Sequence, residues 1–333
     1  MCTNFKIPAA KDGTVTVGRS LEFPTAMPMQ LAVLPNNFEG KATGSDSGVT
    51  WTAKYGAVGV SAFSKPEWLT DGMNTEGLSA HLLYMPGGYA KYQDTQNDGK
   101  DISQVDVIAY LLGTCSTVAE VKEAMADKRV TGFDPGMGFP PPVHVLLHDK
   151  DASIAIEFHP GEVRIVDNPT GVGTNAPYME WHLENLNNYG GFSAATETTT
   201  EAFGETYKAF GQGGGLRGIP GDWTPPARFV RAFAMVTLGD QPSNSQESEQ
   251  FALHMLNAFD IPIGIIKEQV ADGSYVDEVT VWDSIANLTE LRYSYRTVTD
   301  PNVYVIDLKK TDFSAPARIK EFSWSGDFTE TSI

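Results

Sequence analysis

The chain contains little cysteine and no pattern of metal ligands. Its 333 residues include two cysteines, Cys2 and Cys115, and six scattered histidines. This count excludes a disulfide framework, apart from a single Cys2–Cys115 pair. His144 and His148 are four residues apart in a strand-like run, where that spacing does not place two ligands on one face of a helix. We therefore expect no metal site.

Positive charge and long apolar runs are also scarce. The 24 lysines and arginines are outnumbered by 42 aspartates and glutamates, which gives a formal net charge of -18. Because no basic stripe is present to neutralise phosphates, we expect no nucleic-acid partner. No apolar run approaches the roughly 18–20 residues that span a bilayer, so we also expect no membrane insertion.

The first twenty residues are polar and strand-like and do not read as a signal peptide. An exported enzyme that is cut before Cys2 and re-expressed with a start methionine would have the same sequence. The compartment therefore stays open. It is cytoplasmic if Met1 is native, and periplasmic or exported if Met1 replaced a signal peptide.

Apolar patterning predicts blocks of strands that alternate with blocks of helices. Lys11-Asp12-Gly13 has the turn chemistry of a hairpin, and Thr117 has capping-box spacing to Glu120. Strands are predicted at 2–8, 14–23, 49–63, 78–85, 143–148, 152–158, 162–166, 278–285, 291–297 and 303–308. Helices are predicted at 103–112, 117–126, 178–187, 227–238 and 245–259. This order favours an α+β fold of two antiparallel sheets with helices on their outer faces.

We expect residues 1–333 to form one domain, since no linker-like break and no internal repeat interrupts the chain. The segment 189–223 is different, because it is rich in glycine and threonine and poor in core residues. A loop of that length inside a compact domain tends to be functional or to form an interface.

Cys2 is the residue whose position carries the most chemistry. It follows the initiator Met1 and begins a strand-like segment. If Met1 is removed, Cys2 presents a thiol nucleophile and a free α-amine on one residue. Such an amine titrates at about pH 7.7–8.0 and can therefore accept a proton at working pH. A buried structural cysteine is the alternative reading of this position.

Further motifs follow Cys2 in a defined order. They are Met1-Cys2-Thr3, Gly18-Arg19-Ser20-Leu21-Glu22, Asp71-Gly72-Met73-Asn74-Thr75-Glu76-Gly77-Leu78, Thr174-Asn175, Trp181-His182-Leu183-Glu184-Asn185-Leu186, and Gly218-Ile219-Pro220-Gly221-Asp222 with Arg228-Phe229-Val230-Arg231. In order and approximate spacing they resemble the choloylglycine hydrolase family of N-terminal nucleophile (Ntn) hydrolases, which contains bile salt hydrolases and penicillin V acylases. The resemblance implies the four-layer αββα sandwich of the Ntn hydrolases. It also implies a homotetramer in which segment 189–223 reaches onto a neighbouring subunit.

The resemblance assigns roles to five residues. Cys2 is the nucleophile, and Arg19 beside it favours the thiolate. Glu22 stands where the family carries aspartate and would hold the free α-amine, although its extra methylene leaves the geometry of that contact open. Asn175 would donate its side-chain N–H to the developing oxyanion. Arg228 is the second active-site arginine, which would order Glu22 or polarise the thiol.

These roles predict the hydrolysis of a linear amide. The Cys2 sulfur attacks the carbonyl carbon to give a thioester, which water then hydrolyses. The leaving amine takes its proton from the α-ammonium group. No cofactor is required, and the expected substrate is a small amide with an apolar acyl group.

The substrate is less well defined than the reaction. Tyr84 follows the strand at Leu82-Leu83, at a position where bile salt hydrolases tend to carry asparagine and penicillin V acylases tyrosine. Its backbone N–H would be the other oxyanion donor, and its ring offers a flat face to a phenoxyacetyl group. This favours a penicillin V acylase. A bile salt hydrolase and an N-acyl homoserine lactone acylase are alternatives.

Apolar residues on two loops and one strand end are expected to line the acyl site, where methionine and aromatic side chains make an adaptable wall. Besides Tyr84, they are Phe23, Met27, Met29, Phe63, Phe133, Met137 and Phe139.

Two readings from other classes stay open. One is a non-catalytic relative that keeps the fold and binds acyl ligands. The other is a papain-type enzyme, which is disfavoured because Cys2 has no helix-forming sequence behind it and no histidine stands in a recognisable partner motif.

Overall fold

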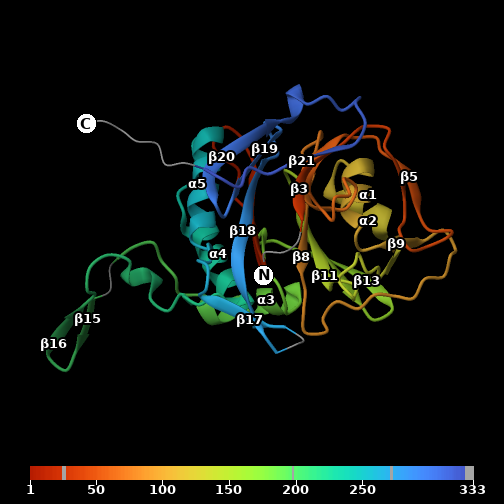
Figure 1. The fold of residues 1–333 in the computed structure, drawn as a ribbon. Helices are drawn as coiled ribbons and strands as arrows, with labels where there is room; N and C mark the ends of the chain where they lie inside the picture. Colours follow the sequence, from red (N-terminus) through yellow and green to blue (C-terminus); the bar gives the residue numbers. More distant parts are fainter. Residues whose placement is uncertain (25–27, 197–198, 271–272, 327–333) are drawn as a thin grey trace.

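Two large antiparallel sheets face each other in the computed structural model, which describes residues 1–24, 28–196, 199–270 and 273–326 (Figure 1). The first sheet has seven strands in these residues, in the order β14 (Val172–Gly173), β1 (Cys2–Lys6), β2 (Thr16–Pro24), β18 (Tyr275–Asn287), β19 (Arg292–Thr297) and β20 (Asp300–Asp307), with β17 (Ile266–Gln269) also on β18. The second has eight, in the order β13 (Glu162–Asp167), β12 (Ser153–His159), β11 (Val143–His148), β8 (Ser79–Tyr84), β7 (Leu69–Asn74), β6 (Ala57–Ala62), β3 (Met29–Leu34) and β21 (Arg318–Glu321).

Helices cover the outer face of each sheet. Helices α4 (Pro225–Leu238) and α5 (Ser245–Asn257) pack on β1, β2 and β18, and α1 (Val107–Thr114) packs on β7 and β8 beside α2 (Val118–Met125) (Figure 1). A short helix, α3 (Met179–Asn185), follows β14. The order helix, sheet, sheet, helix confirms the predicted αββα sandwich.

Three small two-stranded sheets of the described residues lie outside these layers. They are β4 (Glu39–Lys41) with β5 (Thr50–Thr52), β9 (Asp101–Ser103) with β10 (Arg129–Thr131), and β15 (Thr199–Ala202) with β16 (Glu205–Lys208). The last pair lies in segment 189–223, which was predicted without regular structure. The assembly role of that segment, and the single-domain organisation, stay predictions.

Two hydrophobic cores follow from the layer order. One lies between the sheets and beneath α4 and α5, with Phe5, Trp282 and Phe229 fully buried in it. The other lies between the second sheet and α1 and α2, and Leu78 and Leu111 are among its buried residues. Because the strands that carry Cys2 and Arg19 border the first core, their side chains are fixed by packing on both sides.

Several local predictions are confirmed. Strands β1 and β2 pair around the Lys11-Asp12-Gly13 turn. The side chain of Thr117 accepts a hydrogen bond from the Glu120 backbone and caps α2. No helix in the described part of the chain is long and apolar enough to cross a membrane.

The prediction of one strand at 49–63 was wrong. The segment forms β5 and β6, which belong to different sheets. The extended structure is interrupted at Lys54 and Tyr55, where both backbone N–H groups donate to the Gly113 carbonyl at the end of α1 instead of to a neighbouring strand. Apolar alternation runs through this break, so the pattern alone did not reveal it.

Strands β3 and β7 were missed. In β7 the sequence is Leu69-Thr70-Asp71-Gly72-Met73-Asn74, in which polar residues are buried rather than alternating with apolar ones. A charged side chain is normally placed at the surface, and this strand therefore did not match the pattern of a core strand.

Strands β6 and β7 approach each other closely at Gly59 and Gly72, which are cross-strand partners. A Cβ atom on Gly59 would lie 1.9 Å from the carbonyl oxygen of Asp71. The two backbones can approach this closely because glycine at position 59 has no side chain.

Gly59→Ala is expected to lower the free energy of unfolding by about 2–3 kcal/mol, because the added methyl group pushes β6 away from β7. Urea denaturation monitored by circular dichroism measures this. The control is Gly190→Ala, an exposed position with φ of -69° and no heavy atom within 4 Å of the added Cβ. Equal stabilities of the two variants would contradict the close approach.

Candidate active site

The register of the hairpin brings Cys2 and Arg19 together. Cys2 is the partner of Leu21, and Asn4 is the partner of Arg19, in the antiparallel β1–β2 pair. Cross-strand partners share a face, so all four side chains lie on the face of the first sheet that looks toward the second. Both Cys2 and Arg19 are completely buried.

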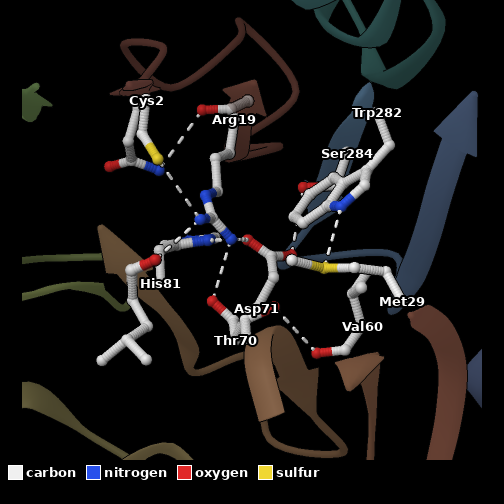
Figure 2. Close-up of polar contacts among 12 residues, drawn as sticks. Cys2, Arg19, Met29, Val60, Thr70, Asp71, His81, Trp282 and Ser284 are labelled. Atoms are coloured by element: carbon white, nitrogen blue, oxygen red, sulfur yellow. Dashed lines mark hydrogen bonds and ion pairs between the residues drawn. The ribbon is translucent and has the colours of Figure 1, made fainter. Parts of the chain in front are cut away.

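The Arg19 guanidinium points at the Cys2 sulfur from the gap between the two sheets (Figure 2). Its Nη2 lies 3.6 Å from Sγ and also donates to the Leu82 carbonyl at 2.7 Å. Its Nη1 donates to the Thr70 carbonyl at 2.8 Å, and the group stacks over the Trp282 ring at 4.7 Å. This fixed cation favours the ionised form of the sulfur.

Asn175 links Cys2 to the second sheet. Its Oδ1 accepts from the Cys2 backbone N–H at 2.9 Å and from Nη2 of Arg228 at 2.6 Å. Its Nδ2 donates to the Tyr84 carbonyl at 2.6 Å. Because two donors face one side of the amide, its orientation is determined, and the second Nδ2 hydrogen is left for a substrate oxygen.

The Tyr84 backbone N–H points to the same side as its carbonyl. In an antiparallel strand the two groups of one residue face the same neighbour. The Tyr84 carbonyl accepts from Asn175, and the pairing of β7 with β8 ends at His81, so no strand of the described chain covers this edge. The Tyr84 N–H and the Asn175 amide therefore face a common position beside Cys2, as an oxyanion hole needs.

Two buried histidines hold the segment that carries Asn175. Nε2 of His144 contacts the Thr174 carbonyl, and Nε2 of His182 contacts the Asn175 carbonyl, each at 2.9 Å. Burial lowers the pKa of both to about 4, so at neutral pH each is uncharged and donates through Nε2. The sequence showed these histidines as scattered, because their spacing does not reveal that both contact carbonyls of the same short segment.

Arg228 orders the backbone of Cys2 rather than its sulfur. It donates to the Cys2 carbonyl, and Nη1 also donates to Oγ1 of Thr3 at 2.8 Å. Burial lowers its pKa, and the negative charge of Glu22 partly offsets this effect. Arg228 reaches Cys2 from α4, on the outer face of the first sheet.

Glu22 is buried, but the Cys2 backbone nitrogen bonds to Asn175 instead. Strand alternation places the Glu22 side chain on the face opposite the Cys2 thiol. One of its oxygens is 3.5 Å from Oγ1 of Thr280, and the other has no partner in the described residues. Its role toward a free α-amine stays a prediction.

Met1 occupies the end of β1 and makes the Cys2 nitrogen a peptide N–H. The Met1 carbonyl accepts from the Glu22 backbone at 2.8 Å, and its α-ammonium lies 3.3 Å from Oε2 of Glu278. In this form Cys2 has a thiol but no free amine. Removal of Met1 would give Cys2 a free α-amine and would empty the space beside it.

An apolar cavity opens next to the sulfur. Its empty volume is about 620 Å³, part of which is open to solvent. Its larger lining side chains are Phe23, Met29, Phe63, Trp68, Tyr84 and Met137. No charged side chain of the described residues lines it.

The other residues predicted for the acyl site lie elsewhere. Phe133 is not in the lining but packs edge-on against Trp68, with ring centroids 5.7 Å apart. Phe139 is 45% exposed and is also absent from the lining. Met27 lies outside the described residues. Met29, which was expected on the same loop as Met27, lines the cavity from the start of β3. Trp68 also lines the cavity but was not predicted, because it follows a turn.

The described residues contain no group of three or more His, Cys, Asp or Glu side chains that could hold a metal ion. The polar groups beside Cys2 instead form a set suited to acyl transfer, with a thiol, a fixed cation and two converging N–H donors.

Comparison with known proteins shows the relationships of the chain. It is 28% identical to a bile salt hydrolase/transferase of Clostridium perfringens over 315 residues, which cover 93% of each protein. It is 24% identical to a penicillin V acylase of Pectobacterium atrosepticum, over 94% of this chain and 82% of that protein. The crystal structure of a mutant conjugated bile acid hydrolase from Clostridium perfringens superposes with a TM-score of 0.87, at 26% identity and full coverage of both chains.

The model of the linear amide C–N hydrolases, choloylglycine hydrolase family, matches residues 2–322. This match begins at Cys2 and spans both sheets and all the residues that converge on the sulfur. The chain therefore belongs to the choloylglycine hydrolase family and is a hydrolase of linear amide C–N bonds.

Proposed function

We propose that the chain is a cysteine amidase of the penicillin V acylase type, which removes an aryl-bearing acyl group from a small amide through a Cys2 thioester. The observation that carries this proposal is the cavity of aromatic and sulfur-bearing side chains beside Cys2. Phe23 and Tyr84 meet edge to face at its wall, with ring centroids 6.0 Å apart. Flat aromatic walls of this kind favour an aromatic acyl group such as phenoxyacetyl.

The first step uses the groups described above once Met1 is removed. The Cys2 sulfur attacks the amide carbon, and its proton passes to the α-amine of the same residue. The carbonyl oxygen gains negative charge and receives N–H groups from Asn175 and Tyr84. Collapse of this intermediate breaks the C–N bond, and the α-ammonium protonates the leaving amine.

The second step releases the acid. A water molecule attacks the thioester carbonyl, the α-amine takes a proton from that water, and the sulfur leaves with its proton restored. Asn175 Oδ1 bonds to the Cys2 nitrogen, which holds the amine in place and leaves its lone pair directed elsewhere. Glu22, buried near Arg228, would add negative charge that stabilises the ammonium form.

Bile salt hydrolysis is the second candidate. The similarity to the bile salt hydrolase/transferase of Clostridium perfringens covers 93% of that protein at 28% identity, whereas the similarity to the penicillin V acylase covers 82% of that protein at 24% identity. The cavity is apolar, as a steroid also requires. N-acyl homoserine lactones are a third candidate substrate, because their fatty acyl chain would also contact this apolar wall.

We also propose that the chain assembles as a homo-oligomer through segment 189–223. Phe203 and Phe210 in this segment are fully exposed, and Tyr207 is more than half exposed. Exposed aromatic side chains within one short segment favour a protein partner. The expected assembly is a tetramer.

Cys2→Ser is expected to fold but to lose at least about 100-fold in kcat on penicillin V, because a serine hydroxyl is a far weaker nucleophile than a thiol. Product release measures kcat, and circular dichroism checks the fold. The control is Cys115→Ser, which changes the other buried cysteine, located at the end of α1. Full activity of Cys2→Ser would refute the assignment of Cys2 as the nucleophile.

A chain that keeps an uncleavable extension before Cys2 is expected to be inactive, because its Cys2 nitrogen stays an amide and cannot accept a proton. The comparison is a chain cleaved by a protease to begin at Cys2, with intact mass confirming each N-terminus. Equal rates on penicillin V would rule out the α-amine as the base.

A substrate panel separates the candidates. Penicillin V, glycocholate, taurocholate and an N-acyl homoserine lactone are compared by kcat/KM, with the Cys2→Ser variant as background. We expect penicillin V to be preferred. Tyr84→Asn should lower kcat/KM for penicillin V about 3- to 10-fold through the loss of an aromatic contact, while Tyr84→Phe keeps it. A higher kcat/KM for glycocholate would establish the second candidate instead.

A further inference from the structure

A buried carboxylate lies directly behind Arg19, on the side away from the sulfur (Figure 2). Asp71 on β7 is completely buried and accepts four hydrogen bonds. Its Oδ2 is 3.2 Å from Nη1 of Arg19 and 2.6 Å from Nδ1 of His81. Its Oδ1 accepts from Oγ of Ser284 at 3.0 Å and from the Tyr293 hydroxyl. These donors come from four strands, so this carboxylate joins the two sheets.

Asp71 carries a negative charge at neutral pH. Burial by itself would raise its pKa, but the charge and hydrogen bond of His81, together with Arg19 and Tyr293, lower the pKa to about 2. A carboxylate only accepts hydrogen bonds, so Nδ1 of His81 carries a hydrogen.

The contacts of Arg19 leave its terminal nitrogens no freedom. Three of the four Nη hydrogens are directed at the Thr70 carbonyl, the Leu82 carbonyl and Asp71. The fourth faces the Cys2 sulfur. Asp71 therefore does two things at once. It restrains the guanidinium, and its charge opposes the field that Arg19 exerts on the sulfur.

We propose that Asp71 is a positioning residue of the reaction, which aims one N–H of Arg19 at the Cys2 sulfur and limits how strongly that cation favours the thiolate. The inference rests on the proposed role of Cys2 as nucleophile. Its consequence is chemical. The sulfur keeps its proton until the α-amine takes it, while the S–H electron pair becomes the S–C bond. The sulfur then attacks as a strongly basic, and hence strongly nucleophilic, group.

The charged groups around Cys2 come from several elements. Arg19 faces the sulfur from β2, with Asp71 and His81 behind it on β7 and β8. Arg228 contacts the Cys2 carbonyl from α4, and Glu22 lies on the opposite face of β2. Of these groups, Asp71 is the carboxylate in contact with Arg19. Substitution of Asp71 therefore changes the charge on the side of the guanidinium away from the sulfur and leaves the residues that line the substrate cavity unchanged.

Asp71→Asn tests the charge while it preserves the shape. An amide oxygen at the place of Oδ2 still accepts from Arg19 and His81, and the hydroxyls of Ser284 and Tyr293 can turn to accept from the new NH₂ group. With Arg19 still in place and its counter-charge gone, the pH midpoint of Cys2 alkylation by iodoacetamide should fall by roughly one unit.

The same variant should show a split between kcat and KM. A thiolate that is less basic by one unit is a weaker nucleophile by about threefold, so kcat on penicillin V falls by that factor. KM should stay unchanged, because Asp71 does not line the cavity. A purely structural role of Asp71 would lower stability without moving the alkylation midpoint.

The matched control is Asp101→Asn. Asp101 is also fully buried and paired with an arginine, Arg129, but it lies on β9, outside both large sheets. This variant should lose stability and keep the wild-type midpoint and kcat. Intact mass follows the alkylation, and thermal denaturation measures stability, with every chain starting at Cys2.

Tyr293→Phe provides a second, independent variant with the opposite expected sign. It removes one donor from Asp71 Oδ1 and keeps the ring, so the negative charge on Asp71 is less well neutralised. That charge then opposes Arg19 more strongly, and the alkylation midpoint should rise by a few tenths of a unit. This variant carries the test if Asp71→Asn does not fold.

An unshifted or raised midpoint in Asp71→Asn, or a lowered midpoint in Tyr293→Phe, overturns the proposal. These results differ from a failure of the proposed function. If Asp71 has no such role, alkylation of Cys2 still abolishes hydrolysis. If Cys2 is not the nucleophile, the Cys2→Ser variant keeps its activity whatever the Asp71 variants do.

Discussion

The burial of a single guanidinium between two sheets is the constraint on which the site depends. Arg19 belongs to the first sheet, while its partners Thr70, Asp71 and Leu82 belong to the second. Removing such a cation from water costs several kcal/mol unless its hydrogen bonds are satisfied. The sheets therefore have to meet at a defined distance and register, and the Cys2 sulfur, 3.6 Å from Nη2, shares that fixed position. Stability and reactivity rest on the same contacts.

The parts of the site that depend on local signals could be predicted from the sequence. The Asp12-Gly13 turn pairs β1 with β2 and thereby brings Arg19 beside Cys2. Asn175 and Arg228 came from the resemblance, and the structure brings both to the Cys2 backbone. The layers of the fold followed from the order of strand and helix blocks.

Contacts between distant segments could not be predicted in this way. Asp71 lies 52 residues from Arg19 and 222 from Tyr293 along the chain, and nothing local to β7 indicates these partners. A strand that carries a carboxylate is predicted to be exposed unless the residues that donate hydrogen bonds to this carboxylate are known. Glu22 is different, because strand alternation already implies that its side chain leaves the face of the Cys2 thiol. The resemblance supplied a role for Glu22 but not this geometry.

The hydrogen bonds around the Cys2 nitrogen are compatible with a chain that starts at Met1 and with a chain that starts at Cys2. With Met1 present, Asn175 Oδ1 accepts the Cys2 peptide N–H, while Arg228 holds the neighbouring carbonyl. An α-amine at the same nitrogen can donate to the same oxygen, so loss of Met1 requires no rearrangement of these partners. What changes is the lone pair that appears on the nitrogen and the space left by Met1 between the Glu22 carbonyl and Glu278. In the proposed mechanism the leaving amine takes its proton from that nitrogen, so it would lie close to the space that Met1 vacates. That mechanism would therefore shape the two sides of the site differently, the acyl side by apolar packing and the leaving-group side by the removal of Met1.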